Sequence, residues 1–319
     1  MKVTVIGCGR WGSLITWYLD RLGHEVTLYG RETSPHMKQL LETRCNDLLS
    51  LSERVTLSTS LRCTEDADVI VISINAQALR VLMERELAPL NLHRKTFVLC
   101  MKGIEVETGK RLSEIVTETS ADDNRVAVWL GPGHVQEFFA GIPNCMVIDS
   151  ADEETKERIV CAFSGDLIRF YYGQDLIGNE IGAAAKNVIG IAAGFLDGLG
   201  LSSLKGALMS RGTREIARLI EAMGGNPISA YGLCHLGDYE ATVFSKFSHN
   251  RAFGEDFVHG KPFTKLAEGY ETVRALCGLS EKYGVELPIC DAVYAVLYEQ
   301  KDAREALEAL FTRSIKKEF

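Results

Sequence analysis

A glycine-rich turn near the start of the chain has a spacing that suits phosphate binding. It reads Gly7-Cys8-Gly9-Arg10-Trp11-Gly12, follows the β-branched run 3–6 and precedes a helical stretch over 11–22. Such glycines allow a tight turn, close approach of the backbone to a pyrophosphate and close helix–strand packing, while the helix N-terminus faces the phosphates. An ordinary tight turn is the alternative, but the position between a strand and a helix favours a site for NAD or NADP.

The residues after the second expected strand, 25–29, bear on the choice between these two dinucleotides. Gly30 and Arg31 stand where NAD-specific sites usually carry an acid that binds the ribose hydroxyls. Arg31 could meet the 2′-phosphate of NADP, and it is also consistent with a solvated loop arginine. The sequence therefore leaves both dinucleotides open.

The pattern of apolar residues places this turn in an α/β domain. Further buried strands are expected at 68–74, 96–101, 126–130, 145–148 and 168–172, as in a parallel sheet covered on both faces. From about Asn179 the apolar residues recur at helical spacing, beginning with a long helix over 181–195. We therefore expect a doubly wound parallel sheet in domain 1–178 and an all-helical domain in 179–319.

Several further segments, taken in chain order, carry a resemblance to a known family. They are Lys102-Gly103-Ile104-Glu105, Gly131-Pro132-Gly133-His134, Ala185-Lys186-Asn187-Val188, Leu236-Gly237-Asp238, Ser248-His249-Asn250-Arg251 and Glu268-Gly269-Tyr270. With the G-x-G-x-W-G turn, they resemble the NAD(P)-dependent glycerol-3-phosphate dehydrogenase family over nearly the whole chain. The resemblance implies a Rossmann domain followed by a helical substrate domain. It also implies reversible reduction of dihydroxyacetone phosphate to sn-glycerol 3-phosphate, which supplies glycerophospholipid synthesis.

The chemistry of ketone reduction explains why a lysine and an aspartate would be needed. Hydride transfer places negative charge on the carbonyl oxygen, so a proton donor must lie beside it. Lys186 is the candidate, because it matches the family's catalytic lysine and because apolar neighbours in its helix could desolvate the ammonium and lower its pKa. Asp238 could accept a hydrogen bond from Lys186 or from the substrate hydroxyl, and Lys102 follows a strand at the ligand-binding edge of the sheet. Each residue also has an ordinary alternative: Lys186 could be a surface lysine, Asp238 a helix N-cap and Lys102 an exposed loop charge.

The resemblance also assigns the remaining contacts. It implies substrate binding at Lys102, Gly131, Gly133, Lys186, Asn187, Asp238, Thr242, Ser248, His249 and Asn250, and cofactor binding at Lys102, Val135, His249 and Glu268. The glycine turn adds Gly7, Gly9, Trp11 and Gly12 to the expected cofactor contacts, together with Arg31 and with Arg10, which replaces the family's usual serine. For Glu268, a solvated glutamate is equally consistent with the sequence.

Two departures from the family pattern concern the substrate. Gly133 stands where the family has a serine, and His249 stands where it has an arginine that binds phosphate. A largely neutral histidine cannot reproduce a bidentate arginine contact, and Arg251 points elsewhere if the segment is helical. A paralogous reductase of another hydroxyketone, phosphorylated or not, is therefore an alternative. A dinucleotide-binding protein without catalysis is a second, although Lys102, Lys186 and Asp238 argue against it.

The composition of the chain limits the kinds of partner that it is expected to bind. A net charge of -8 over 319 residues argues against nucleic-acid binding, whereas a small phosphorylated substrate needs only local cations. The nine cysteines are scattered, without metal-ligand spacing, so we expect thiols, a cytoplasmic location and no metal. We expect no integral membrane segment, because no apolar run approaches about 20 residues. The apolar helix faces are compatible with burial inside the chain or in a homodimer.

Overall fold

The chain divides into a sheet unit and a helical unit. In the computed structural model, residues 1–315, 317 and 318 are described. The sheet unit comprises 1–102 and 110–176, and the helical unit comprises 103–109 and 177–319. The division at 176/177 lies two residues before the boundary expected from the sequence. Segment 103–109, which a single boundary assigns to the first domain, groups with the helices because Ile104 lies in their core.

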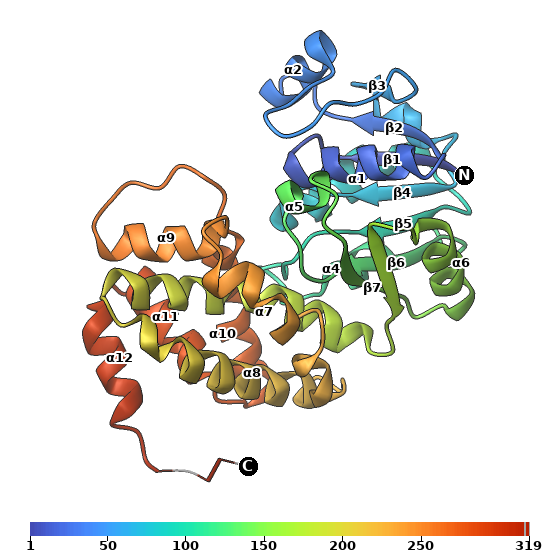
Figure 1. The fold of residues 1–319 in the computed structure, drawn as a ribbon. Helices are drawn as coiled ribbons and strands as arrows, with labels where there is room; N and C mark the ends of the chain where they lie inside the picture. Colours follow the sequence, from blue (N-terminus) through green and yellow to red (C-terminus); the bar gives the residue numbers. More distant parts are fainter. Residues whose placement is uncertain (316, 319) are drawn as a thin grey trace. The chain divides into compact units, whose positions relative to one another are not determined.

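The sheet unit is built on eight strands in the order β3-β2-β1-β4-β5-β6-β7-β8, shown in Figure 1. They are β1 (Lys2–Ile6), β2 (Glu25–Tyr29), β3 (Thr56–Ser58), β4 (Val69–Ile72), β5 (Thr96–Leu99), β6 (Arg125–Leu130), β7 (Asn144–Asp149) and β8 (Ile168–Tyr172). The first six follow the Rossmann order 3-2-1-4-5-6 and are parallel. The sheet is mostly parallel, as expected from the sequence, with one exception: β7 runs antiparallel to β6.

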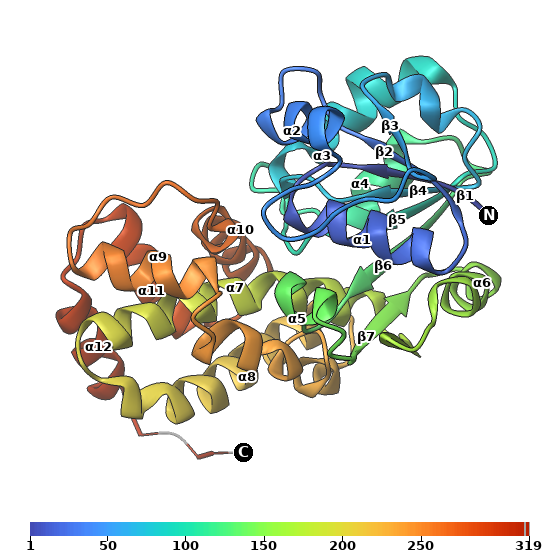
Figure 2. The same cartoon turned by 45° about the horizontal axis from the view of Figure 1, so that its top comes forward.

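Helices cover both faces of this sheet, as Figure 2 shows with α1 on one side and segments of α3 and α4 on the other. The helices are α1 (Arg10–Arg21), α2 (Pro35–Thr43), α3 (Leu79–Val81), α4 (Leu112–Thr119), α5 (Val135–Phe139) and α6 (Glu153–Phe163). A π-helical turn, Leu82–Leu87, extends α3. Right-handed crossovers lead away from β1 in opposite directions and so place helices on opposite faces, which explains the near-continuous apolar strands.

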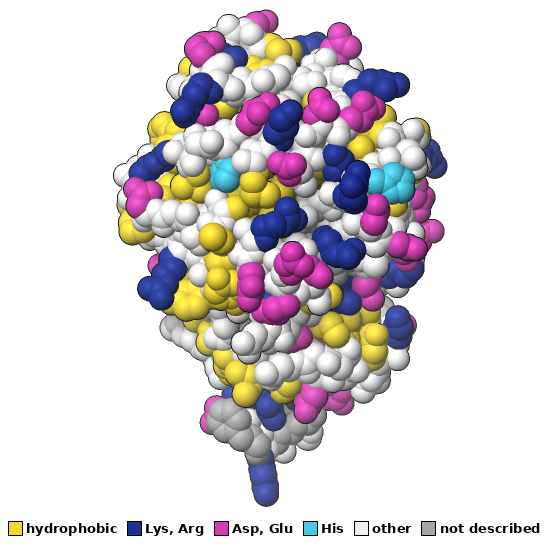
Figure 3. Space-filling model, turned by 90° about the vertical axis from the view of Figure 1, so that its right-hand side faces the viewer, with side chains coloured by type: hydrophobic (Ala, Val, Ile, Leu, Met, Phe, Trp, Pro, Cys, Tyr) yellow, Lys and Arg dark blue, Asp and Glu magenta, His cyan; other side chains and the backbone are white. Residues whose placement is uncertain are grey.

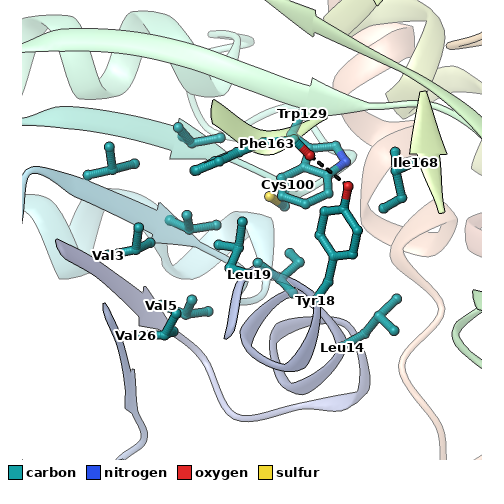
Figure 4. Close-up of a cluster of buried hydrophobic side chains, with 14 of the residues drawn as sticks. Val3, Val5, Leu14, Tyr18, Leu19, Val26, Cys100, Trp129, Phe163 and Ile168 are labelled. Carbon is teal, nitrogen blue, oxygen red and sulfur yellow. Dashed lines mark hydrogen bonds between the residues drawn. The ribbon is translucent and has the colours of Figure 1, made fainter. Parts of the chain in front are cut away.

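The core between the sheet and α1 contains aromatic rings with satisfied polar atoms (Figure 4). Tyr18 of α1 and Trp129 of β6 are each 1% exposed and pack edge to face, with ring centroids 6.1 Å apart. The Tyr18 hydroxyl donates to the carbonyl of Phe163 at 2.7 Å, and burial raises the Tyr18 pKa. This bond fixes the C-terminal end of α6 against α1 and therefore steadies the helix that begins at the glycine turn.

The helical unit is organised around α7 (Leu176–Gly198), which is buried continuously from Gly178 to Leu196. It begins five residues earlier than the expected start at 181, because burial stabilises a segment whose own pattern is weakly helical. The other helices are α8 (Lys205–Ala222), α9 (His249–Val258), α10 (Glu268–Tyr283), α11 (Pro288–Tyr298) and α12 (Ala303–Phe311). Between α8 and α9 lie the 3-10 turns Pro227–Tyr231 and Leu236–Asp238 and the π-helical turn Glu240–Phe244.

Two contacts hold these helices close together. Gly194 of α7 and Gly254 of α9 face each other, and a Cβ at Gly194 would lie 2.1 Å from the carbonyl oxygen of Arg251. The carboxylate of Glu215 in α8 accepts the backbone N–H groups of Ile289 (2.9 Å) and Cys290 (3.0 Å) at the start of α11. The first contact requires glycine, and the second satisfies amides that the start of α11 leaves without helical partners.

The surface carries mixed charge. On the face shown in Figure 3, Lys and Arg side chains are interspersed with Asp and Glu. The net charge of -8 is therefore not gathered into one acidic patch on that face. Among the residues that the structure describes, none of the helices combines the length and apolarity needed to cross a membrane.

Candidate active site

The glycine turn connects β1 to α1 and has the geometry of a phosphate cradle. Gly7 has φ +115°, and a Cβ there would lie 2.1 Å from the carbonyl oxygen of Ser73, which follows β4. A Cβ at Gly12 would lie 1.8 Å from the carbonyl oxygen of Gly7, so both positions require glycine. Gly9 differs, because nothing lies within 4 Å of its Cβ position and α1 begins at the next residue. This open approach to a helix N-terminus fits the pyrophosphate of a dinucleotide.

Other residues expected at the cofactor lie around this turn or at helix starts. Arg10 is the exposed first residue of α1, and Trp11 packs edge to face on Phe138 with ring centroids 6.0 Å apart. Val135 is the buried first residue of α5. Glu268 is the half-buried first residue of α10 in the helical unit, where a carboxylate suits the helix dipole.

Packing at the end of β2 explains why position 30 is a glycine and not the acid that is usual in NAD-specific sites. A Cβ at Gly30 would lie 2.6 Å from the Cys8 sulfur and 2.9 Å from the Met37 Cβ. A side chain at this position therefore requires Cys8 or Met37 to move. The first side chain after β2 that reaches solvent is that of Arg31.

Lys102 lies at the carboxyl ends of β5 and β6. Its Nζ donates to the carbonyl oxygen of Gly131 at 2.6 Å, within the sheet unit. Gly131 directly follows β6 and has φ +128°, with its Cβ position 3.0 Å from the Cα of Met146 on β7. The ammonium of Lys102 thus fixes the Gly131–His134 turn at the edge of the sheet where α/β folds bind ligands.

The glycine at position 133, in place of the family's serine, has a steric explanation that the sequence did not reveal. Its φ is +146°, and a Cβ would lie 2.2 Å from the Cε2 atom of Phe138. Phe138 is 1% exposed, so its ring occupies the space that a serine side chain would need. The Phe138 ring therefore leaves no room for a serine side chain at position 133.

In the helical unit, Lys186, Asp238 and Thr242 form a buried polar cluster. The Lys186 Nζ lies 3.1 Å from the Asp238 Oδ2 and donates to the Thr242 Oγ1 at 2.8 Å. The side chains of Lys186 and Asp238 are 10% and 1% exposed. The Lys186 ammonium therefore lies beside a carboxylate as well as among the apolar residues of its helix.

A second polar chain lies beside Lys186. Asn250 donates from its Nδ2 to the Oδ1 of Asn187 at 3.0 Å and accepts the backbone N–H of Gly269 at 2.9 Å. Gly269 has no side chain to obstruct this contact, since a Cβ there would lie 2.7 Å from the carbonyl oxygen of Asn187. Asn250 therefore ties α9 both to α7 and to the start of α10.

The segment from Ser248 to Arg251 begins α9. Ser248 is its N-cap, accepting the backbone N–H of Arg251 at 3.3 Å, and His249 is the half-buried first helical residue. Arg251 points toward Asp197, whose Oδ2 lies 2.8 Å from its Nη1. Lys205 binds the same carboxylate oxygen at 2.6 Å. Arg251 thus anchors α9 and does not substitute for an arginine at position 249.

Two buried residues next to this cluster, His235 and Tyr239, were not among the site residues predicted from the sequence. They flank Asp238, and both are 0% exposed. The signal available was a histidine and a tyrosine four residues apart around the candidate aspartate. As for metals, the described residues form no group of three or more His, Cys, Asp or Glu side chains suited to a metal ion.

Comparisons with known proteins agree with this geometry. Residues 2–156 match the sequence model of the NAD-dependent glycerol-3-phosphate dehydrogenase N-terminus, and residues 175–308 match that of its C-terminus. Glycerol-3-phosphate dehydrogenase (NAD(P)+) of Prosthecochloris aestuarii is 36% identical over the full length of both chains. That of a Thermoanaerobacter species is 34% identical, covering 100% of this chain and 99% of its own.

A solved structure shows the same architecture. The crystal structure of glycerol-3-phosphate dehydrogenase from Coxiella burnetii superposes with a TM-score of 0.91 at 27% identity, covering 98% of this chain and 99% of that one. The two family models together span most of the chain, on both sides of the division between the sheet and helical units. The chain therefore belongs to the NAD-dependent glycerol-3-phosphate dehydrogenase family and is an NAD(P)-dependent oxidoreductase.

Proposed function

We propose that this chain reversibly reduces dihydroxyacetone phosphate to sn-glycerol 3-phosphate, with Lys186 as the proton donor to the ketone oxygen. The observation that carries the residue assignment is the buried contact of Lys186 with Asp238 and Thr242. The nicotinamide cofactor, when bound, supplies the hydride. An ammonium can donate a hydrogen bond to a ketone oxygen and transfer its proton there as hydride arrives at the carbon. Asp238 lies 3.1 Å from the amine and fixes its direction.

Replacement of Lys186 tests this assignment. Lys186→Met should lower kcat for dihydroxyacetone phosphate reduction by about 10²–10⁴-fold, the usual contribution of a general acid. The matched control is Lys205→Met, which removes a lysine of similar burial whose amine binds Asp197 and the carbonyl oxygen of Val243. Lys205→Met should lower Tm, and its loss of kcat should be smaller than that of Lys186→Met. A folded, cofactor-binding Lys186→Met enzyme with the wild-type rate would show that the donor is another group.

The substrate phosphate is proposed to bind at the first turn of α9, near His249 and Asn250. The N-terminus of a helix attracts an anion. This attraction at the start of α9 would partly replace the arginine that the family carries at position 249. The same departure favours a second candidate function, reduction of a different hydroxyketone. Dihydroxyacetone phosphate and unphosphorylated dihydroxyacetone should therefore be compared. We expect kcat/KM to favour the phosphorylated ketone by at least about tenfold, because remote binding energy lowers the barrier. Equal values would favour the second candidate.

For the cofactor, we propose that NADP is accepted as well as NAD, through Arg31. The crowded position at Gly30 and the exposure of Arg31 support this. Arg31→Ala should raise KM for NADPH severalfold and leave KM for NADH nearly unchanged. Arg10→Ala is the control, because a contact with the pyrophosphate would raise both KM values together. Equal effects of Arg31→Ala on the two cofactors would contradict a 2′-phosphate contact.

The cellular setting is part of the same proposal. A role in supplying glycerophospholipid synthesis follows from the proposed product. A cytoplasmic location is supported by nine cysteines held as thiols, four of them buried. The homodimer stays a prediction, which light scattering of the purified protein would test.

A further inference from the structure

We infer that His235 and Tyr239 are positioning residues that hold Asp238 and Thr242 against Lys186. The inference rests on the proposed role of Lys186 and extends it to two fully buried residues that hold its partners. It concerns the segment from the 3-10 turn Leu236–Asp238 to the π-helical turn Glu240–Phe244, which supplies Asp238 and Thr242 to the Lys186 amine.

His235 makes one hydrogen bond with each ring nitrogen. Its Nδ1 donates to the carbonyl oxygen of Gly182 at 2.8 Å, so Nδ1 carries the proton. Its Nε2 then accepts from the Tyr239 hydroxyl at 2.7 Å. Burial lowers the His235 pKa to about 4, so the ring is neutral at physiological pH and its tautomer is fixed by both partners.

The anchor point on α7 is one helical turn from Lys186. In an α-helix the carbonyl oxygen of residue 182 is the acceptor for the backbone N–H of residue 186. His235 therefore binds the same turn of α7 that carries the proposed acid. A Cβ at Gly182 would lie 3.0 Å from the His235 Cβ, so glycine permits this close approach.

Tyr239 anchors the other side of Asp238. Its ring packs on His235 with centroids 4.9 Å apart, and its hydroxyl lies 3.4 Å from the Cβ position of Gly212 in α8. Backbone hydrogen bonds connect the two aromatic residues to the partners of the amine. The Asp238 N–H donates to the carbonyl oxygen of His235 at 3.0 Å, and the Thr242 N–H donates to that of Tyr239 at 3.1 Å. Movement of either aromatic residue would thus displace Asp238 and Thr242 from the amine.

The ionisable groups around this pair are few. Asp238 and Lys186 face His235, whereas Glu215 and Cys290 face Tyr239 from α8 and α11. Burial raises the Tyr239 pKa, so its hydroxyl remains a donor across the working range. Proton exchange with the substrate is not required of either residue, which separates positioning from catalysis.

Three variants and one control test the inference. His235→Ala should lower kcat about 10–100-fold, because small misplacements of a catalytic group cost up to about 10²-fold, and KM for dihydroxyacetone phosphate should change much less. His235→Asn, whose amide can still donate to Gly182, should recover most of the rate. Tyr239→Phe should lower kcat severalfold. Tyr298→Phe is the control, because it removes a hydroxyl that donates to the carbonyl oxygen of Tyr270 at 2.7 Å in the same unit.

The pH–rate profile gives a readout that lost stability alone would not change. In His235→Ala the alkaline limb should move to lower pH, because a displaced Asp238 carboxylate stabilises the Lys186 ammonium less. The inference is wrong if His235→Ala and Tyr239→Phe lower Tm as Tyr298→Phe does, while kcat stays within twofold of wild type and the alkaline limb of the pH–rate profile does not move. If His235→Ala does not fold, Tyr239→Phe decides. An active Lys186→Met enzyme would refute the proposed acid; an inactive one with an unaffected Tyr239→Phe enzyme would refute the positioning role alone.

Discussion

The serine that the family carries at position 133 cannot simply be restored in this chain. Gly133 has φ +146°, and a Cβ there would lie 2.2 Å from Phe138 Cε2 and 2.6 Å from Cζ. Phe138 cannot turn away freely, because it is buried and packs against Trp11. We therefore predict that Gly133→Ser is strongly destabilising alone and better tolerated together with Phe138→Val.

The magnitude follows from two separate costs. Overpacking of a buried ring costs about 1–3 kcal/mol, and a side chain at this φ adds about 1–3 kcal/mol of backbone strain. Gly133→Ser should thus lower the free energy of unfolding by about 2–6 kcal/mol. Phe138→Val has its own cavity cost. In the double variant the overpacking cost disappears, so the loss should fall short of the sum of the single losses by about 1–3 kcal/mol.

A double-mutant cycle measured by urea unfolding would test this. The three tryptophans Trp11, Trp17 and Trp129 all lie in the sheet unit, so their emission reports on the unit that changes. Gly23→Ser is the matched control: Gly23 has φ +86° with nothing within 4 Å of its Cβ position, so it shares the strain without the clash. A coupling energy below about 0.5 kcal/mol between Gly133→Ser and Phe138→Val would refute the steric explanation.

Two further predictions concern the helical unit. Burial raises the Glu215 pKa from 4.5 to about 7, so its contribution to stability is complete below about pH 4.5 and is lost as the pH rises through about 7. Urea titrations should therefore show Glu215→Gln gaining about 3 kcal/mol relative to wild type between pH 4.5 and 8, whereas exposed Glu221→Gln should run parallel to wild type. Gly194→Ala should lower Tm by several degrees, because its Cβ would meet the carbonyl oxygen of Arg251 at 2.1 Å. Gly278→Ala, with nothing within 4 Å of the new Cβ, should raise Tm slightly; equal shifts would contradict the packing argument.

Much of the sheet could be predicted because parallel strands buried on both faces are nearly continuous apolar runs. β3 was missed, since Thr56–Ser58 is short, at the edge of the sheet and only partly buried. The direction of β7 was also missed, because an apolar run looks the same in either direction. The information lay in the connection over 131–143, whose only helix is the five-residue α5. A parallel crossover usually needs a longer helix.

The site was predicted less directly than the fold. Lys186 and Thr242 are 56 positions apart, and no periodicity in the sequence joins them. The family resemblance identified both, but it said nothing of the contacts between them or of Gly133 and Phe138. Steric causes of this kind depend on which side chains the fold brings together, and single positions do not reveal them.

The composition of α7 shows how folding and function constrain each other. From Gly178 to Leu196 this helix is buried, so every polar side chain in it needs a partner or destabilises the unit. Lys186 has Asp238 and Thr242, and Asn187 has Asn250. A buried ion pair contributes little to stability on balance, and breaking one by removing a single partner costs about 3–5 kcal/mol. Stability alone would therefore be served as well by apolar residues at these positions, whereas a reductase needs a charged donor held in one direction. The presence of this polar cluster in a buried helix is therefore better explained by the proposed proton transfer than by packing.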